Sequence, residues 1–200
     1  GKGARPPIAV RGLGRLGYRE MDFGSDVGLV FVHDSKGRDT AADRVGASRL
    51  CETVVRLLST LSRDGQLYRV DLRLRPSGSK GELVHSPAGL LAYFQTEADT
   101  WEMLSFLKAR AVAGDQELGE GVVASVERAI LERAGSMDEA GLRSEVRDMR
   151  RRLAEAAEKA TTTRHLKHGA GGIADIDFIL EYLQLRHGIP GPKDKDTLRL

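Results

Sequence analysis

The sequence predicts an α+β fold, in which a small mixed sheet with flanking helices, from about Ile8 to Val84, is followed by a helical segment. A continuous run of β-branched, leucine and aromatic residues at 29–32 is typical of a buried central strand. Strict alternation of apolar and charged residues at 67–75 is typical of a half-buried strand. From Ser86 onward, apolar residues recur at the three- and four-residue spacing of helices.

Composition narrows the class of protein. The 200 residues can bury a core without disulfides, and the single cysteine, Cys51, excludes a disulfide framework and a Cys-rich zinc site. We therefore expect a reducing, cytoplasmic setting. The net charge of +2 and the absence of a long apolar run predict a soluble protein with neither a membrane nor a nucleic-acid partner. Because residues 196–200 look like the start of a new segment, we expect a piece of a longer protein.

The N-terminal part begins with a short strand, Ile8–Val10, which runs into the glycine-rich stretch 12–17. Backbone amides of such a stretch can cradle phosphate, yet it has neither the Walker A pattern nor the Rossmann spacing. A tight turn is an equally good interpretation. After a polar loop, apolar residues from Ser48 predict a helix that ends near Gly65.

The stretch Gly24–His33 reads as a Gly-Ser turn, a carboxylate and a strand. In two-metal nucleotidyl transfer sites, a turn cradles the nucleotide phosphates, and carboxylates two residues apart on a strand hold divalent metal. The first carboxylate is present as Asp26, whereas the second position is Gly28, which has no side chain. The stretch therefore indicates a phosphoryl-transfer site that lacks one ligand.

The alternating stretch at 67–75 supplies further charged side chains. Its apolar positions are expected on one face: Val70, Leu72 and Leu74. Its charged positions are expected on the other: Arg69, Asp71, Arg73 and Arg75. One interpretation is a solvated face with weak ion pairs. The other is a metal-binding carboxylate beside arginines that meet phosphate oxygens.

The remainder predicts helices. Ser86 and Pro87 are a good N-cap and first residue, and one apolar stripe follows them: Leu90, Leu91, Phe94, Ala98, Trp101 and Leu104. In this stripe Trp101 is interpreted as a core residue. Asp115 is expected to cap another helix, which Gly135 and Ser136 break. The segment 142–160 is helical with an arginine-rich face, interpreted as solvated.

A glycine-rich loop, Lys167–Gly172, leads into the last predicted helix, Ile173–His187. Its expected apolar stripe consists of Ile176, Ile179, Leu180 and Leu183. Such a loop can bind an anion at the helix N-terminus. Asp175 and Asp177 lie near the start of the helix, where compensation of the helix dipole is a sufficient explanation for them.

Four segments in order resemble the signatures of one family. They are Gly14–Asp26, Val70–Gly78, Thr100–Asp115 and Gly171–Phe178. The family is that of the bifunctional glutamine synthetase adenylyltransferase/adenylyl-removing enzymes, within the DNA polymerase β-like nucleotidyltransferases. The resemblance covers nearly the whole chain and implies one catalytic half, with a nucleotidyltransferase core at 1–85 and a helical remainder, with the start of a helical extension, at 86–200.

The resemblance implies an enzyme. One half of such enzymes transfers AMP from ATP to a tyrosine of glutamine synthetase, and the other removes it by phosphorolysis. Glu145–Arg150, Arg75–Gly78 and Asp175–Asp177 look closer to the transferase half, and the removing half stays open. The implied partners are ATP or another adenine nucleotide, glutamine synthetase and, through the full-length enzyme, a PII-type signalling protein.

The resemblance also implies roles for individual residues. Asp26 and Asp71 would be catalytic and would hold Mg²⁺. The nucleotide would be bound by Gly24, Ser25, Arg73, Arg75, Lys108 and Arg110. Gly28 departs from the family pattern, which has an aspartate there; the nearby carboxylates Glu20, Asp22 and Asp34 lack the strand spacing from Asp26. A degenerate module that binds nucleotide or a partner without turnover is therefore an alternative.

Overall fold

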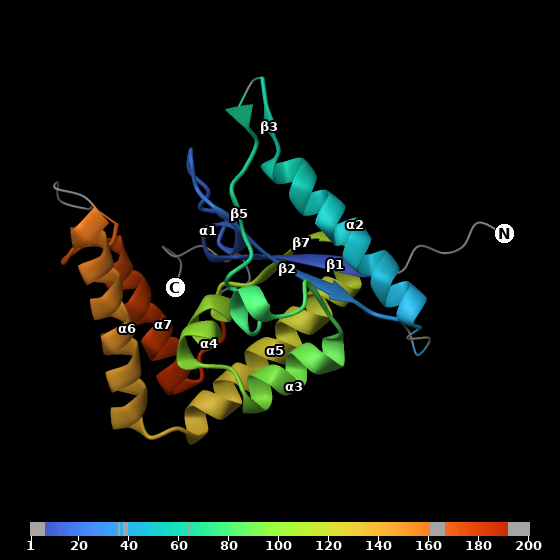
Figure 1. Cartoon of the computed structure of the whole chain (residues 1–200). Coiled ribbons are helices and arrows are strands. Elements are labelled where there is room, and N and C mark those ends of the chain that lie inside the picture. The colour runs from blue at the N-terminus through green and yellow to red at the C-terminus, as the bar shows by residue number, and fades with distance from the viewer. Residues whose placement is uncertain (1–6, 36, 38–39, 64, 161–166, 192–200) are drawn as a thin grey trace.

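A computed structural model describes residues 7–35, 37, 40–63, 65–160 and 167–191 (Figure 1). It confirms the α+β class, because a small mixed sheet is packed between helices. The strands of this sheet are β1 (Ile8–Leu13), β2 (Val27–His33), β5 (Val70–Asp71), β6 (Val84–His85) and β7 (Arg110–Gly114).

The sheet is built around β2, which was predicted as a buried central strand. Strand β1 pairs with β2 in antiparallel register, from Ile8 opposite His33 to Leu13 opposite Gly28, and β7 pairs with the other edge of β1. The short strands β5 and β6 both run parallel to β2, β5 near its beginning and β6 near its end. All residues of β2 are buried, which confirms the prediction.

Helices cover both faces of the sheet (Figure 1). One face packs against α2 (Ala41–Ser59), and the other packs against α3 (Pro87–Thr96), α4 (Thr100–Leu107) and α5 (Gln116–Ser136). The alternation of side chains along β2 fits both layers, since Leu29 and Phe31 join the core that contains Cys51 of α2, whereas Val30 and Val32 join the core of the other helices.

The predicted long strand at 67–75 is wrong beyond Asp71. Only Val70 and Asp71 pair as a strand, and the chain then turns. Val70 and Leu72 pack on the α2 side as expected, but Leu74 packs into the core on the opposite face. The turn crosses from one face to the other, because β5 and β6 pair with opposite ends of β2 and residues 72–83 must leave the sheet between them.

The single helix predicted after Ser86 is two helices. The N-cap is confirmed, since Ser86 Oγ accepts a hydrogen bond from the backbone N–H of Gly89 at 3.0 Å. The first helix ends at Thr96, and a second helix, α4, begins at Thr100. At the start of α4, the Glu102 carboxylate accepts a hydrogen bond from the backbone N–H of Asp99 at 2.9 Å. The periodicity continued across this break and hid it. Trp101 is half-buried on α4.

The region after Ser86 also contributes a strand. Residues 110–114, in the part predicted to be helical, form β7 and complete the sheet beside β1. The segment is only five residues long, and three of them are alanine or glycine, which are depleted in strands, so sequence reasoning missed it. The division between 85 and 86 stays a prediction, and the sheet takes strands from both sides of it. Asp115 caps α5 as predicted, accepting a hydrogen bond from the Leu118 N–H at 3.0 Å.

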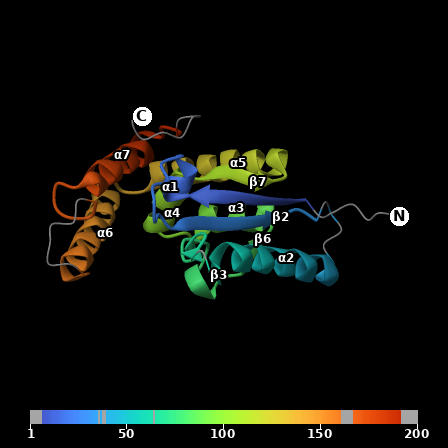
Figure 2. The same ribbon diagram turned by 90° about the horizontal axis from the view of Figure 1, so that it is seen from above.

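The last two helices, α6 (Glu139–Ala160) and α7 (Ile173–His187), pack together at the end of the sheet where β1 leads into α1 (Gly14–Gly17) (Figures 1 and 2). The stripe predicted to be buried on α7 is largely on the surface, with Ile176 58% and Ile179 59% exposed. The buried face instead carries Glu181 and Gln184 beside Ala174 and Leu185. None of the helices in the described ranges is long and apolar enough to span a membrane.

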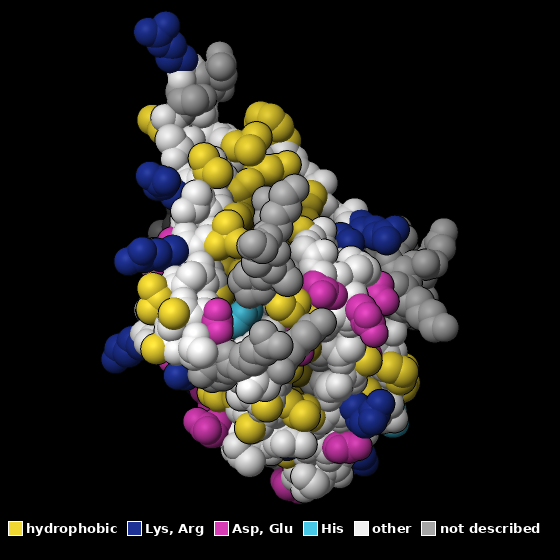
Figure 3. Space-filling model, turned by 90° about the vertical axis from the view of Figure 1, so that its right-hand side faces the viewer, with side chains coloured by type: hydrophobic (Ala, Val, Ile, Leu, Met, Phe, Trp, Pro, Cys, Tyr) yellow, Lys and Arg dark blue, Asp and Glu magenta, His cyan; other side chains and the backbone are white. Residues whose placement is uncertain are grey.

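Helix α2 begins earlier and ends earlier than predicted. At its end a hairpin of β3 (Leu61–Ser62) and β4 (Gly65–Gln66) projects from the body of the molecule. Hydrophobic side chains gather on the upper part of the face shown in Figure 3. Among the exposed ones near this end of α2 are Leu57, Leu61 and Leu67.

Candidate active site

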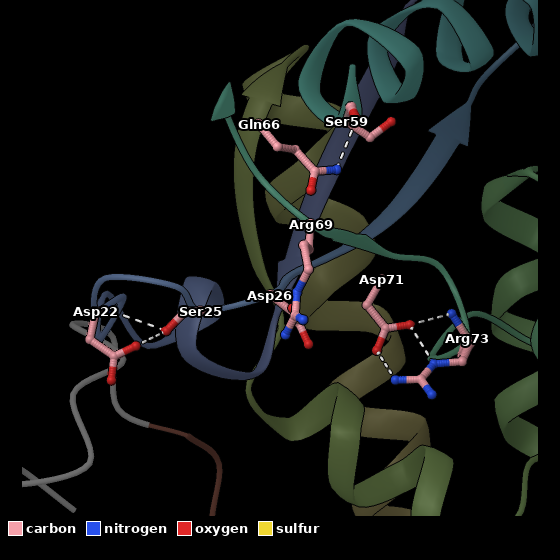
Figure 4. Close-up of polar contacts among 8 residues, drawn as sticks. All are labelled: Asp22, Ser25, Asp26, Ser59, Gln66, Arg69, Asp71 and Arg73. Atoms are coloured by element: carbon pink, nitrogen blue, oxygen red, sulfur yellow. Dashed lines mark hydrogen bonds and ion pairs between the residues drawn. The ribbon is translucent and has the colours of Figure 1, made fainter. Parts of the chain in front are cut away.

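The two aspartates singled out in the sequence lie on neighbouring strands. Asp26 directly precedes β2, and Asp71 ends β5. The parallel register places Val27 beside Val70 and Gly28 beside Asp71. Asp71 lies beside Gly28, and Asp26 is two residues before Gly28. Since side chains two residues apart along a strand point to the same face, the carboxylates of Asp26 and Asp71 belong to one face of the sheet. They line one open cleft of about 420 Å³ (Figure 4).

Each aspartate is held by an exposed arginine. Arg69 Nε donates to Asp26 Oδ1 at 2.7 Å, and Arg73 donates to both carboxylate oxygens of Asp71 at 3.0 and 2.9 Å. Hydrogen bonds from Arg73 hold the pKa of Asp71 below its ordinary value, against the effect of partial burial. The side chains of Arg69 and Arg73 are 71% and 79% exposed, so both guanidinium groups are within reach of a ligand in the cleft.

Gly28 is where the site departs from a two-metal arrangement. It is buried between Leu13 of β1 and Asp71 of β5. A Cβ atom at this position would lie 3.3 Å from Leu13 Cβ and 3.5 Å from Leu74 Cδ1. Leu74, which was expected on the other face, therefore packs beside the position at which a second carboxylate would begin. Sequence reasoning missed this contact because it depends on the turn after Asp71.

The carboxylates of Asp26 and Asp71 fit a Mg²⁺ ion that takes only part of its ligands from the protein. Mg²⁺ commonly takes one or two carboxylates together with waters and nucleotide phosphates, and Asp26 and Asp71 supply that number. They do not supply the bridging carboxylate of a two-metal site. Within the described ranges, no group of three or more His, Cys, Asp or Glu side chains is arranged to hold a metal.

The Gly-Ser turn is folded against Asp22 rather than over Asp26. Ser25 Oγ accepts a hydrogen bond from the Asp22 backbone N–H at 3.1 Å and donates to its carboxylate (Figure 4). The Arg15 guanidinium pairs with the same carboxylate, and hydrogen bonds from Ser25 and then Arg15 lower the pKa of Asp22. Asp22 is thus occupied and does not replace the missing ligand. Gly24 has a φ of 83°, in the region that favours glycine.

The three other cations predicted to meet phosphate have partners within the protein. Arg75 donates to the carbonyl oxygens of Leu72, Ser79 and Gly81 and so closes the turn after β5. Lys108 pairs with two carboxylates of α7, and Arg110 donates to backbone carbonyls near Gly17. The residues that line the cleft of Asp26 and Asp71 do not include these three. Their contact with nucleotide stays a prediction.

The α7 carboxylates were interpreted as compensation of the helix dipole, and the structure gives each a cation. Arg150 of α6 pairs with Asp175 at 2.5 Å, and Lys108 pairs with Asp177 at 2.9 Å and Glu181 at 2.8 Å. Burial raises the pKa of Glu181 to about 7, against the charge of Lys108. No sequence pattern indicated Glu181, because its partner lies far away along the chain.

A second, larger cleft of about 590 Å³ lies at the other end of β2. Among the residues that line it are His33, His85 and Ser86, and burial lowers the pKa of His85. The Nε2 atoms of both histidines are buried without a hydrogen-bond partner. This cleft shares no lining residue with that of Asp26 and Asp71.

Known proteins share this arrangement of sequence. Residues 1–125 match the family model described as glutamate-ammonia ligase adenylyltransferase. Several curated bifunctional glutamine synthetase adenylyltransferase/adenylyl-removing enzymes are similar to nearly the whole chain. The enzyme of Thioalkalivibrio sulfidiphilus is 39% identical over 96% of the chain, that of Streptomyces avermitilis 37% over 90%, and that of Xanthomonas campestris pv. campestris 41% over 87%.

The matched region is only part of these enzymes. The chain covers 20%, 18% and 19% of their respective lengths, about one fifth in each case. Yet the family model spans more than half of the chain, and it includes the turn at Ser25, both aspartates and β7. On these grounds the chain belongs to the glutamate-ammonia ligase adenylyltransferase family.

Proposed function

We propose that the chain is a nucleotidyltransferase half of a glutamine synthetase adenylyltransferase, which transfers AMP from ATP to a tyrosine of glutamine synthetase. The observation that carries this proposal is the pair Asp26 and Asp71, which line one open cleft from neighbouring parallel strands, each beside an exposed arginine. The names of the similar enzymes support glutamine synthetase as the substrate.

The chemistry is an in-line displacement at the α-phosphorus of ATP: a bond to the tyrosine oxygen forms as the bond to pyrophosphate breaks, and the proton of the tyrosine hydroxyl is released to solvent. When Mg²⁺ is bound, by Asp26 and Asp71, it neutralises charge on the phosphate oxygens. The chain's own contribution is position and charge. Arg69 and Arg73 can exchange their exposed ion pairs for phosphate oxygens, because such pairs contribute little stability.

Two alternatives are favoured by particular observations. The adenylyl-removing half has the same superfamily chemistry in the phosphorolytic direction, and the similar enzymes carry both activities in their names. A degenerate module that binds nucleotide, glutamine synthetase or, within a full-length enzyme, a PII-type protein is favoured by Gly28 and by the packing of Leu74 beside it.

The proposal is tested with the native chain and its Gly28→Asp variant. Binding of Mg²⁺-ATP is measured by calorimetry, and AMP transfer is measured by the mass shift of glutamine synthetase. We expect both chains to bind Mg²⁺-ATP and the variant to transfer AMP faster. Gly46→Asp is the matched control, because it adds the same carboxylate on α2 with no atom within 4 Å of its Cβ.

The outcomes separate the alternatives. Equal and measurable rates for the native chain and Gly28→Asp would show that the missing carboxylate does not limit turnover, and the degenerate module would be wrong; binding of Mg²⁺-ATP by the native chain without turnover in either direction would overturn the proposed activity and favour that module. Release of ADP from adenylylated glutamine synthetase and inorganic phosphate would assign the removing half. If neither chain binds Mg²⁺-ATP, the nucleotide site itself is wrong.

A further inference from the structure

Lys108 sits in a buried charge cluster at the end of α4. Its ammonium nitrogen is 2.9 Å from Asp177 Oδ1 and 2.8 Å from Glu181 Oε1, two carboxylates that lie one turn apart on α7. The three side chains are only 13%, 22% and 10% exposed. Two of the three ammonium donors are thereby used. Because an unpaired buried charge is costly, this cluster fixes the end of α4 against α7.

The segment 108–110 also contacts α1 (Gly14–Gly17) and the residue after it, Tyr18. The Lys108 ammonium lies 5.2 Å from the centre of the Tyr18 ring, and Tyr18 is 1% exposed. Arg110 donates to the carbonyl oxygens of Gly17 and Leu16, both at 2.9 Å. A cation at the C-terminal carbonyls of a helix is favourable. A Cβ atom on Gly17 would lie 1.7 Å from the Lys108 carbonyl oxygen, so the two backbones are in direct contact.

From α1 the contacts continue into the Ser25 turn. The backbone N–H of Glu20 donates to the carbonyl oxygen of Arg15 at 2.8 Å, which folds the chain back after the helix. The Arg15 guanidinium pairs with the Asp22 carboxylate and lies 3.5 Å from Ser25 Oγ. Ser25 N–H donates to the Asp22 carbonyl oxygen at 3.1 Å, directly before Asp26.

The loop that precedes α7 lies on the same side. The carbonyl oxygen of Lys167 accepts a hydrogen bond from the Ala174 N–H at 2.9 Å, which ties the loop to the start of α7. Burial and then the positive charge of Arg15 lower the pKa of Lys167. The loop thus brings a second cation near Arg15, whereas the contacts that join α7 to α1 run through the segment 108–110.

We propose that Lys108 and Arg110 are positioning residues, which hold the Ser25 turn beside Asp26 by joining α1 to α7, and are not phosphate ligands. This inference rests on the proposed function only where it says what the turn is for. It makes α7, at the far end of the chain, a structural part of the nucleotide site. The two cations that motif comparison assigned to phosphate act on the protein's own carboxylates and carbonyls.

Hydrogen exchange tests the positioning without any ligand. Amide exchange is followed by mass spectrometry in the native chain and in Lys108→Met and Arg110→Met, for peptides that cover 14–26 and, as reference, 116–136 of α5. We expect exchange in 18–26 to become about tenfold faster in both variants and exchange in α5 to stay unchanged in Arg110→Met, because the substitutions remove contacts that local opening of 18–26 has to break. Glu139→Gln is the control, because it breaks an exposed ion pair between α6 and α7 without touching Lys108.

Unchanged exchange at 18–26 in either folded variant would overturn the proposal. If Lys108→Met does not fold, the result for Arg110→Met decides whether the proposal holds. Arg110 is only partly buried, and its replacement removes just its two hydrogen bonds to α1.

A second measurement separates positioning from direct phosphate contact. Mg²⁺-ATP is titrated into Lys108→Met and into the triple variant Lys108→Met/Asp177→Leu/Glu181→Met. We expect the single variant to bind about tenfold more weakly and the triple variant to recover, because apolar residues can replace a whole buried ion cluster. Binding that stays weak in a folded triple variant would show that the lysine itself contacts phosphate. If the native chain does not bind Mg²⁺-ATP, the proposed function fails, and the exchange result still decides the positioning.

Discussion

Two clusters of this chain each combine two carboxylates with one or two cations, and the clusters differ in how deeply their cations are buried. At Asp26 and Asp71 the cations are 71% and 79% exposed, whereas Lys108 in the α7 cluster is 13% exposed. Exposed pairs contribute little to stability and can be exchanged for a ligand, but a buried pair cannot lose one member without a large cost. The solvent exposure of the cations, rather than the number of charges, therefore distinguishes the proposed binding cleft from the structural cluster of Lys108, Asp177 and Glu181, which we call the brace.

The largest effect should come from Lys108→Met. It leaves the carboxylates of Asp177 and Glu181 facing each other without a cation, and we expect a loss of about 3–5 kcal/mol in the free energy of unfolding. Urea unfolding followed by circular dichroism measures this loss. Arg186→Met, which breaks only the exposed pair with Glu139, is the matched control and should leave the urea midpoint nearly unchanged. A loss similar to that of the control would contradict the contrast between the clusters.

An intermediate effect is expected for Gly28→Asp. The new carboxylate would stand beside Asp71 and against Leu13 and Leu74, and we expect it to lower the free energy of unfolding by about 1–3 kcal/mol without metal. Millimolar Mg²⁺ should restore much of this loss, because it binds the folded state through both carboxylates. Gly28→Ala, measured in the same thermal melts, keeps only Asp26 and Asp71 and should gain less from Mg²⁺. An equal response of the two variants would show that position 28 does not face the metal site.

The smallest effect should come from Arg73→Ala. Its ion pair with Asp71 is exposed, so we expect at most about 1 kcal/mol of lost stability. The same variant should weaken binding of Mg²⁺-ATP, because the cation is lost from the cleft. Arg151→Ala, which breaks an exposed pair with Asp148 on α6, controls for the loss of any surface arginine. Destabilisation as large as that of Lys108→Met would place Arg73 with the structural charges.

Local patterns predicted much of this molecule correctly. The apolar run of β2 and the caps at Ser86 and Asp115 follow from residues close together in sequence. The juxtaposition of Asp26 and Asp71, on segments far apart in the chain, was implied by the family resemblance and not by any local pattern. What failed depends on turns and distant contacts. The period of 67–75 could not show that the chain turns after Leu72 and carries Leu74 to the other face.

The helical stripe of α7 failed for a related reason. Its isoleucines have the spacing of a buried face, but the helix is oriented by Asp177 and Glu181, which meet Lys108. A cation on α4 and two carboxylates on α7 have no local signature that joins them.

The position of Trp101 allows changes near the brace to be followed by tryptophan fluorescence. It is the sole tryptophan of the chain, and it lies on α4, the helix that Lys108 caps. Its ring is half-buried, and its Nε1 donates to Asp99 at 3.3 Å. Tryptophan emission shifts to the red when water reaches the indole. The molecule therefore carries an intrinsic optical reporter on α4, which needs no added dye and could follow the loosening of the Lys108 end in real time.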